Sequence, residues 1–374
     1  MPHTEAVVDL AAIAANVATL KSNTAAELMA VVKADGYGHG MLPAARAALA
    51  GGAGWLGVAM LDEALALRAA GIEAPVLAWL WTPGEAETLR AALAAGVDVS
   101  VSSGQALELV LAAATELGRT ARVHLKIDTG LSRNGCTAAD WPALLEATAK
   151  AVAAGAVEAT GIWSHFAAAD SPGHPSIAHQ LEAFGDALAV ARGHGVVPEL
   201  RHLANSAATL TLPQGHFDLV RPGVAVYGLS PVPDRGNFGL VPAMTLRSSV
   251  AGVKRVPTGS GVSYGHTYVT ERETTLALVP LGYADGVPRA ASNTGPVAIG
   301  GARYTVSGRV CMDQFVVDVG DAEVGAGEEV VLFGPGSDGE PTAQDWADVL
   351  DTIHYEIVTR VGSRVPRSYS GGAA

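Results

Sequence analysis

The regular alternation of strand-like and helix-like segments is the feature that most constrains the fold of this chain. From about residue 11 to 235, short β-rich runs alternate with Ala/Leu-rich stretches. Eight β runs, each followed by a helical stretch within about 220 residues, match a (β/α)₈ barrel in number and length. The expected strands are Leu28–Lys33, Trp55–Met60, Pro75–Leu80, Asp98–Ser102, Arg122–Asp128, Ala159–His165, Glu199–Leu203 and Leu219–Val226. The expected helices include Met60–Ala70, Glu85–Ala95, Gly104–Leu117, Ala139–Ala154 and Ile177–Gly193.

A doubly wound open sheet is the alternative for the same pattern of segments. That fold usually carries a G-x-G-x-x-G loop after its first strand, where it holds a dinucleotide. No such loop follows Leu28–Lys33. The barrel is therefore the preferred fold class.

The pattern changes after about residue 240, which indicates a second domain. Short alternating or β-branched runs are separated there by Gly, Pro and Asp turns, so we expect an all-β domain. Residues 1–10 contain the β-like run Ala6–Leu10, which we expect to pair with that domain. The predicted division is a barrel over 11–235 and a β-rich domain over 1–10 and 240–370, followed by a disordered tail, Ser370–Ala374. The β runs are Thr275–Val279, Arg303–Gly308, Gln314–Val319 and Glu329–Phe333.

Composition excludes several classes of function. The 374 residues are 49% hydrophobic and 16% charged, which supports a large core. A net charge of −13 argues against a nucleic-acid partner. No apolar stretch approaches the roughly 20 residues of a membrane helix, and the first ten residues lack a secretory pattern. Cys136 and Cys311 provide neither a disulfide framework nor a metal cluster. We expect a soluble, cytoplasmic protein that binds a small molecule and no metal.

Lys33 is the residue that points most directly to chemistry. It lies at the end of an apolar run, Ala30–Val32, and a glycine-rich turn follows it. A lysine stripped of water loses proton affinity and becomes an amine that can form a Schiff base with a carbonyl. Taken alone, such a lysine more often extends its ammonium to solvent. The functional interpretation depends on the polar residues elsewhere in the chain.

Polar side chains collect where five of the predicted barrel strands end. In a barrel, the carboxyl ends of all strands open onto one face, where active sites of this fold are built. Loop polarity explains any single one of these residues, but not seven at five strand ends. They are Lys33, Lys126, Asp128, His165, Asn205, Ser206 and Arg221.

Nine motifs in order give the chain a resemblance to bacterial alanine racemases, which are barrel-type pyridoxal 5′-phosphate enzymes. The resemblance covers nearly the whole length. The motifs are Val31–Gly40, Lys126–Gly135, Trp163–Phe166, Ala204–Ser206, Arg221–Gly228, Val262–Gly265, Gly282–Gly286, Gly308–Gln314 and Thr352–Glu356.

The resemblance implies that Lys33 carries pyridoxal phosphate covalently. Hydroxyls and backbone amides can hold a phosphate without a basic residue. The remaining cofactor-binding residues that it implies are Tyr37, His165, Asn205, Ser206, Arg221, Gly223, Val224 and Tyr355.

Arg221 and Tyr264 carry the mechanism that the resemblance implies. Arg221 would face the cofactor's pyridine nitrogen and leave it largely unprotonated, because a guanidinium does not surrender its proton. Racemisation removes a proton from one face of Cα and returns one on the other, so two bases are needed. The resemblance supplies Lys33 and, from the partner subunit of a homodimer, Tyr264, with His165 lowering the phenol's proton affinity.

The substrate site follows from the same resemblance. Arg133 and the backbone amide of Met312 would hold the substrate carboxylate, and Lys126 matches a lysine that is carbamylated in many relatives. A narrow aromatic gate would admit alanine and exclude longer side chains. The gate residues are Tyr283, Tyr355, Asp170 and Arg309.

Interconversion of L- and D-alanine, which supplies D-alanine for peptidoglycan, is the predicted function. A serine or broad-specificity racemase is the main alternative. A barrel-type amino-acid decarboxylase does not need Tyr264, and a pyridoxal phosphate carrier does not need residues 240–370. A non-catalytic binding protein does not need Lys33, Arg221 and Tyr264 together.

Overall fold

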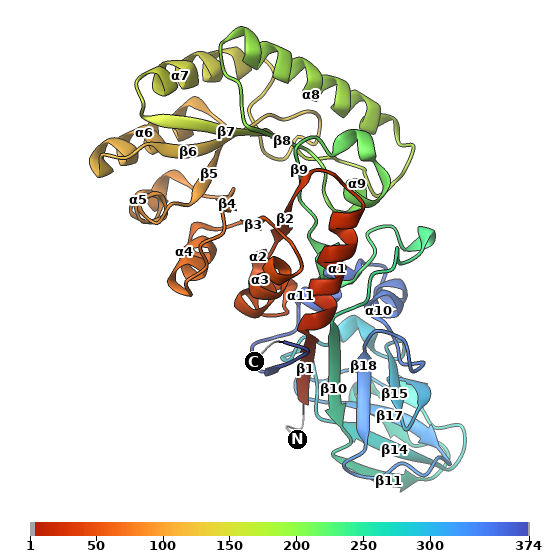
Figure 1. Cartoon of the computed structure of the whole chain (residues 1–374). Coiled ribbons are helices and arrows are strands. Elements are labelled where there is room, and N and C mark those ends of the chain that lie inside the picture. Colours follow the sequence, from red (N-terminus) through yellow and green to blue (C-terminus); the bar gives the residue numbers. More distant parts are fainter. Residues whose placement is uncertain (1–3, 373–374) are drawn as a thin grey trace.

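Eight parallel strands form the barrel in the order β8-β7-β6-β5-β4-β3-β2-β9. The computed structural model describes residues 4–372 (Figure 1). Between β8 and β9, Asp218 N donates to Arg201 O (3.0 Å) and Arg221 N donates to Ala204 O (2.9 Å), which nearly closes the barrel. The strands are β2 Glu27–Val31, β3 Trp55–Val58, β4 Val76–Ala78, β5 Asp98–Val101, β6 Ala121–Lys126, β7 Val157–Trp163, β8 Leu200–His202 and β9 Leu219–Val220.

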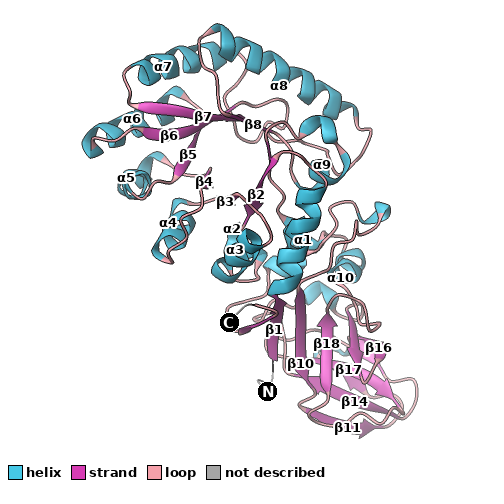
Figure 2. Ribbon diagram, viewed as in Figure 1, coloured by secondary structure: helices cyan, strands magenta, loops and turns pink. Residues whose placement is uncertain are grey.

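Helices cover the outside of this sheet (Figure 2). In α6, Leu107, Val110 and Ala114 are buried at helical spacing, which places one apolar face against the strands. The helices are α1 Leu10–Ser22, α2 Lys33–Tyr37, α3 Met41–Ala50, α4 Leu61–Ala69, α5 Ala86–Ala94, α6 Gly104–Leu117, α7 Trp141–Ala153, α8 Pro175–Gly193 and α9 Ser206–Thr211. Short 3₁₀ turns are η1 Pro83–Glu85, η2 Pro213–Gly215, η3 Val224–Tyr227 and η4 Pro233–Arg235.

The barrel predicted from the sequence is confirmed, but several strands are shorter than expected. Lys33 follows β2 after one intervening residue, and His165 lies two residues beyond β7. The largest difference is in the predicted strand Leu219–Val226, of which only Leu219–Val220 pairs with β2. Pro222 lacks an N–H for the ladder, and the chain turns into η3 instead.

The second domain is built on a six-stranded sheet in the order β16-β15-β18-β10-β1-β19, with smaller sheets beside it. The six strands are β1 Thr4–Asp9, β10 Met244–Ser249, β15 Pro296–Ile299, β16 Ala302–Thr305, β18 Glu329–Phe333 and β19 Arg367–Ser370. The smaller sheets are β11 Gly252–Val256, β14 Thr274–Val279 and β17 Phe315–Gly320, and the pair β12 Gly261–Val262 and β13 Tyr268–Val269. The 3₁₀ turns are η5 Tyr264–His266 and η6 Arg289–Ala291.

Both ends of the described chain contribute strands to this domain. β1 pairs antiparallel with β10 and parallel with β19. The prediction of disorder from Ser370 onwards is wrong for Ser370, which ends β19; Ala373 and Ala374 lie outside the described residues. The guanidinium of Arg367 donates to four backbone carbonyls, including those of Gly38 and Val361, and this anchors β19.

Two helices interrupt the predicted run of strands in this domain, α10 Ala343–Leu350 and α11 His354–Thr359. A capping box begins α10, because Thr342 Oγ1 accepts from Asp345 N and the Asp345 carboxylate accepts from Thr342 N. α11 contacts α2 and brings Tyr355 to the barrel. Within residues 4–372, no helix is both long and apolar enough to cross a membrane.

Candidate active site

A cavity of about 710 Å³ opens at the carboxyl ends of the barrel strands. Strand ends supply most of its walls, and α11 of the second domain closes one side with Tyr355. The structure brings together around it eleven residues that the sequence predicted: Lys33, Tyr37, Lys126, Arg133, His165, Asn205, Ser206, Arg221, Gly223, Val224 and Tyr355.

A left-handed turn follows Lys33. Ala34, Asp35, Gly36 and Tyr37 have φ angles of 53°, 52°, 60° and 53°. L-residues avoid this region, so neighbouring contacts must stabilise it. Glu63 Oε1 accepts from Ala34 N (2.7 Å), and Asp35 Oδ1 accepts from Met41 N (2.9 Å). The turn therefore sets both Lys33 and Tyr37 on the cavity wall.

The amine of Lys33 is poised for chemistry by its surroundings. Burial lowers its pKa from the ordinary value, and the positive charge of Arg133 lowers it further. Glu63 opposes these effects. A lysine with a lowered pKa is unprotonated more often near neutrality, and only the free amine is a nucleophile or a base.

Four basic side chains line the cavity, namely Lys33, Lys126, Arg133 and Arg221. None of the described lining residues is Asp or Glu, and none of the ion pairs within residues 4–372 includes these four groups. Burial and the charges of Arg221 and Arg133 lower the pKa of Lys126 to about 8. The cavity is therefore a preformed site for an anionic ligand.

Arg221 is held in the cavity wall by neutral acceptors. Nη2 donates to Ser164 O (2.8 Å) and approaches His165 Nδ1 (3.3 Å), while Nη1 donates to His202 Nδ1 (3.1 Å). Its guanidinium lies 4.8 Å from the ring centroid of Trp163. Burial lowers the pKa of Arg221 to about 9, which leaves it protonated at neutral pH.

A second group of contacts forms a small polar cradle after β9. Ser206 Oγ accepts from Gly223 N (2.8 Å) and Ala225 N (3.3 Å). A Cβ at Gly223 would lie 2.2 Å from the hydroxyl of Tyr37, so only glycine fits there. Asn205 caps α9 by accepting from Ala208 N (3.1 Å). Backbone amides and hydroxyls thus converge beside the amino end of α9.

Asp128, one of the seven polar residues at the predicted strand ends, shapes a loop beside the cavity. Its Oδ1 accepts from the backbone N–H groups of Gly130, Leu131 and Ser132 at 2.9–3.1 Å. It is absent from the cavity lining and instead shapes the loop that carries Arg133. A short acidic side chain that folds its own loop is common at strand ends.

Five predicted site residues do not line the cavity of this chain: Tyr264, Tyr283, Arg309, Met312 and Asp170. The first four belong to the second domain, where Tyr264, Tyr283 and Met312 are exposed. Hydrogen bonds at or next to these residues link their segments, since Ser263 Oγ donates to Arg309 O (2.7 Å) and Tyr283 N donates to Cys311 O (3.0 Å). We refer to Tyr264, Tyr283, Arg309 and Met312 as the exposed cluster.

Several residues that line the cavity were not predicted as site residues, notably Trp79, Trp163, Asn134 and Thr359. Trp163 and Asn134 belong to two of the nine motifs, but a tryptophan in a strand is ordinarily a core residue, and Trp163 is indeed buried. Lys126 Nζ lies 4.3 Å from its ring centroid. His202, in the predicted strand Glu199–Leu203, also contacts Arg221 without any local sequence signal.

Comparisons with known proteins agree along the whole chain. The family model of the alanine racemase N-terminal domain matches residues 8–231, and that of the C-terminal domain matches residues 243–369. An alanine racemase of Salinispora arenicola is 62% identical over 99% of both chains. The crystal structure of alanine racemase from Streptomyces lavendulae superposes with a TM-score of 0.98 at 58% identity, covering 100% of this chain and 98% of that one. Alanine racemase from Streptomyces coelicolor gives 0.97 at 57% identity, covering 99% and 98%. This chain belongs to the alanine racemase family.

Proposed function

We propose that this protein is an alanine racemase that interconverts L- and D-alanine with pyridoxal 5′-phosphate. The observation that carries the proposal is the pairing of Lys33 with Arg221 in one cavity whose described lining has no carboxylate. A decarboxylase of this fold selects cationic side chains, which a cavity with four basic groups does not favour. Family membership supports the same assignment.

The cavity fits the cofactor in volume, charge and donor chemistry. A volume of about 710 Å³ lies within the ordinary range for a small cofactor with its substrate. The amides of Gly223 and Ala225 converge on Ser206 Oγ beside the Tyr37 hydroxyl, and a phosphate could take the place of that oxygen as their acceptor. Asn205, Val224 and Tyr355 complete the binding wall, and Lys33 is the amine for covalent attachment.

When bound, the cofactor supplies an electron sink that makes the Cα proton of the amino acid acidic. Arg221 would face the ring nitrogen as a donor that does not release its proton, so the ring stays largely unprotonated and the sink moderate. Lys33 would then take or return the proton on one face of Cα. A moderate sink favours rapid reprotonation at Cα over transamination.

The second base is assigned to Tyr264 of the partner subunit in a homodimer. Tyr264 is 71% exposed and is held in a strained turn, with Ser263 at φ 60° and His266 at φ 44°. An exposed tyrosine and an exposed methionine, Met312, in the same domain suit a contact surface. In a two-fold dimer each exposed cluster would cover the other chain's cavity. His165 in that cavity would donate a hydrogen bond to the phenolate of Tyr264.

We assign the binding of the substrate carboxylate to Arg133 and the backbone amide of Met312. Arg133 lines the cavity of its own chain, whereas Met312 belongs to the exposed cluster and would arrive from the partner. Tyr355 and Asp170 on one chain, with Tyr283 and Arg309 from the other, would form the gate. Burial raises the pKa of Tyr355, and the charges of Tyr37 and Asp170 raise it further.

Lys126 is assigned as a carbamylated lysine. Its pKa of about 8 leaves a fraction of the amine neutral at physiological pH, and only a neutral amine reacts with CO₂. Arg221 and Arg133, which lower that pKa, would also stabilise the anionic carbamate. The modified side chain would then orient Arg133 towards the substrate.

In the cell we assign the enzyme to the cytoplasm, where it would supply D-alanine for peptidoglycan.

The substrate preference of the enzyme can be tested directly. The purified protein, loaded with pyridoxal phosphate, is incubated separately with L-alanine, L-serine and L-lysine, and the D-enantiomer is quantified by chiral chromatography. We expect alanine to be preferred by at least about 100-fold in kcat/KM, since a narrow pocket excludes larger groups. Comparable rates with serine would favour the broad-specificity racemase, and CO₂ release from lysine would favour the decarboxylase.

A further inference from the structure

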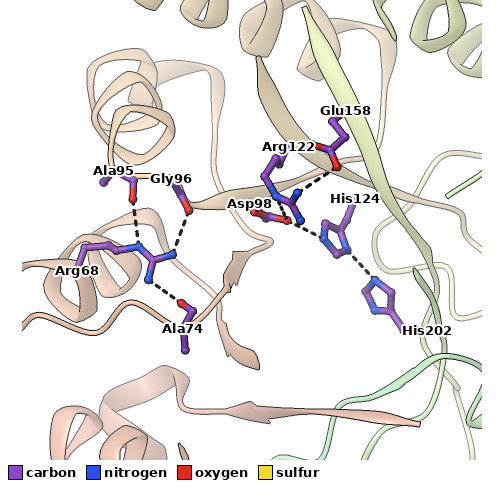
Figure 3. A network of polar contacts seen from close by, with 9 residues as sticks. All are labelled: Arg68, Ala74, Ala95, Gly96, Asp98, Arg122, His124, Glu158 and His202. Carbon is purple, nitrogen blue, oxygen red and sulfur yellow. Dashed lines mark hydrogen bonds and ion pairs between the residues drawn. The ribbon is translucent and has the colours of Figure 1, made fainter. Parts of the chain in front are cut away.

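A chain of buried polar side chains crosses the barrel interior and ends on Arg221. Asp98, the first residue of β5, is 2% exposed, and His124 on β6 and His202 on β8 are fully buried. Asp98 Oδ2 lies 3.1 Å from His124 Nε2, His124 Nδ1 lies 2.8 Å from His202 Nε2, and His202 Nδ1 lies 3.1 Å from Arg221 Nη1. Figure 3 shows the part of this chain from Asp98 to His202.

The two ends of the chain determine where every proton lies. A guanidinium only donates, so His202 Nδ1 must present its lone pair to Arg221. His202 Nε2 then carries the proton and donates to His124 Nδ1. His124 Nε2 in turn donates to the Asp98 carboxylate, which only accepts. With both imidazoles neutral, this is the single arrangement that satisfies all three contacts.

The packing around the two histidines is built for this arrangement. The ring of His202 stacks on Trp163 with an interplanar angle of 6°, and Trp163 Nε1 donates to Ser100 Oγ (3.0 Å), which fixes the rings. A register shift between β6 and β7 places Gly161 opposite His124. A Cβ at Gly161 would lie 2.2 Å from His124 Nδ1, so the strand leaves room for the imidazole only with glycine there.

Arg122 anchors the far end of the chain. Its Nε lies 3.0 Å from Asp98 Oδ1, and its Nη1 lies 3.1 Å from Glu158 Oε1. This contact gives the buried carboxylate of Asp98 an ion-pair partner. Two carboxylates therefore bind the same guanidinium, but only Asp98 also contacts His124 (Figure 3). Glu158 provides a matched control for charge and position.

We propose that Asp98, at the amino end of β5, and His124, within β6, are positioning residues that act on the active site from the barrel interior. The carboxylate of Asp98 fixes the tautomer of His124. The tautomer of His124 in turn fixes that of His202, so that His202 Nδ1 stays an acceptor facing Arg221. Without this chain, His202 can present an N–H to the guanidinium, and two donors then face each other. Arg221 would leave the position that the proposed function requires of it. The kinetic part of this inference rests on that function, whereas the tautomer part does not.

The test combines ring-nitrogen NMR of ¹⁵N-histidine protein with kinetics of the loaded enzyme. His124→Gln and His202→Gln assign the signals. In the unaltered protein, both with and without the cofactor, His124 and His202 should each carry one proton, on Nε2. In Asp98→Asn, whose amide can donate as well as accept, His202 should lose its single tautomer. The kcat of the Asp98→Asn enzyme for alanine should fall about tenfold, while its KM stays within about twofold of the parental value.

Glu158→Gln should leave both the ring signals and kcat unchanged. A proton on Nδ1 of His202 in the unaltered protein would overturn the proposal, and this result needs no measurement of activity. Unchanged ring signals and kcat in folded Asp98→Asn would overturn it as well. If the unaltered protein racemises nothing but shows the predicted tautomers, the function has failed and the positioning chain stands.

Discussion

The guanidinium of Arg221 lies 3.3 Å from Nδ1 of His165 through its Nη2 atom. Because a guanidinium cannot accept a hydrogen bond, the lone pair of His165 Nδ1 faces it. Burial lowers the pKa of His165 well below its ordinary value, and the charges of Arg221, Arg133, Lys126 and Lys33 lower it further. His165 is therefore neutral at physiological pH, with its proton on Nε2. It can donate a hydrogen bond to an anion in the cavity without carrying a positive charge.

Replacing Arg221 should change the outcome of the reaction as well as its rate. In Arg221→Glu, a carboxylate facing the ring nitrogen favours a protonated ring, which is a stronger electron sink. Racemisation should fall, and pyruvate formed per racemisation event should rise by about tenfold or more. Arg221→Lys keeps the charge and should leave this ratio low. An unchanged ratio in Arg221→Glu, with thermal unfolding like that of the parent protein, would refute the assigned contact.

Lys33→Ala should abolish racemisation and covalent attachment of the cofactor, because it removes both the attachment point and one base. The measurement is the visible absorbance of bound cofactor after dialysis, together with D-alanine formation. Lys150→Ala, at an exposed lysine paired with Glu146, should leave both unchanged. Retention of dialysis-resistant cofactor absorbance by Lys33→Ala would mean that another lysine binds it.

Carbamylation of Lys126 should depend on pH in a definite direction. At constant CO₂ pressure the carbamate should increase as pH rises from 6 towards 8, because the amine becomes neutral as pH approaches its pKa of about 8. Carbon NMR with ¹³CO₂ provides the measurement, and the signal should vanish in Lys126→Ala. A carbamate signal that persists in that variant, or that shrinks as pH rises, would contradict the assignment.

A pair of glycine substitutions tests the left-handed turn after Lys33. Gly38 and Gly118 both end helices with positive φ, of 82° and 59°. A Cβ at Gly118 would meet nothing within 4 Å, so Gly118→Ala should cost only the backbone strain, about 1 kcal/mol. A Cβ at Gly38 would lie 2.4 Å from Val358 O of α11. Gly38→Ala should therefore cost about 3 kcal/mol or more in urea unfolding of the cofactor-free protein. Equal losses in the two variants would show that the contact with α11 contributes nothing.

The barrel was predictable because its strands and helices differ in hydrophobic period. The face that carries the site was predictable because polar residues collect at the carboxyl ends of the strands. Helix α6 was predicted to its exact bounds, and in the structure Ser103 and Gly118 cap it. Strand ends at Lys33 and Val226 were misplaced by up to six residues. A left-handed turn follows the first of these strands, and Pro222 with the turn into η3 ends the second.

Contacts across the barrel interior could not be predicted in the same way. His124 and His202 are 78 positions apart and lie in strands separated by β7, and they meet only because the sheet closes. Likewise, Asp128 has the residue type of a catalytic group but folds its own loop. Residue type at a strand end identifies the active face, whereas the function of each side chain depends on distances that the sequence does not contain.

The central claim is that Lys33 in the barrel of one chain acts with Tyr264 from the second domain of another. Homodimers of Lys33→Ala and of Tyr264→Ala should each be nearly inactive. Equal amounts of both are refolded together, and mixed dimers are quantified by mass. With random pairing, about a quarter of the parental activity should return, since half the dimers are mixed and each has one intact site. Activity no greater than the mean of the two variants, with mixed dimers present, would contradict the claim.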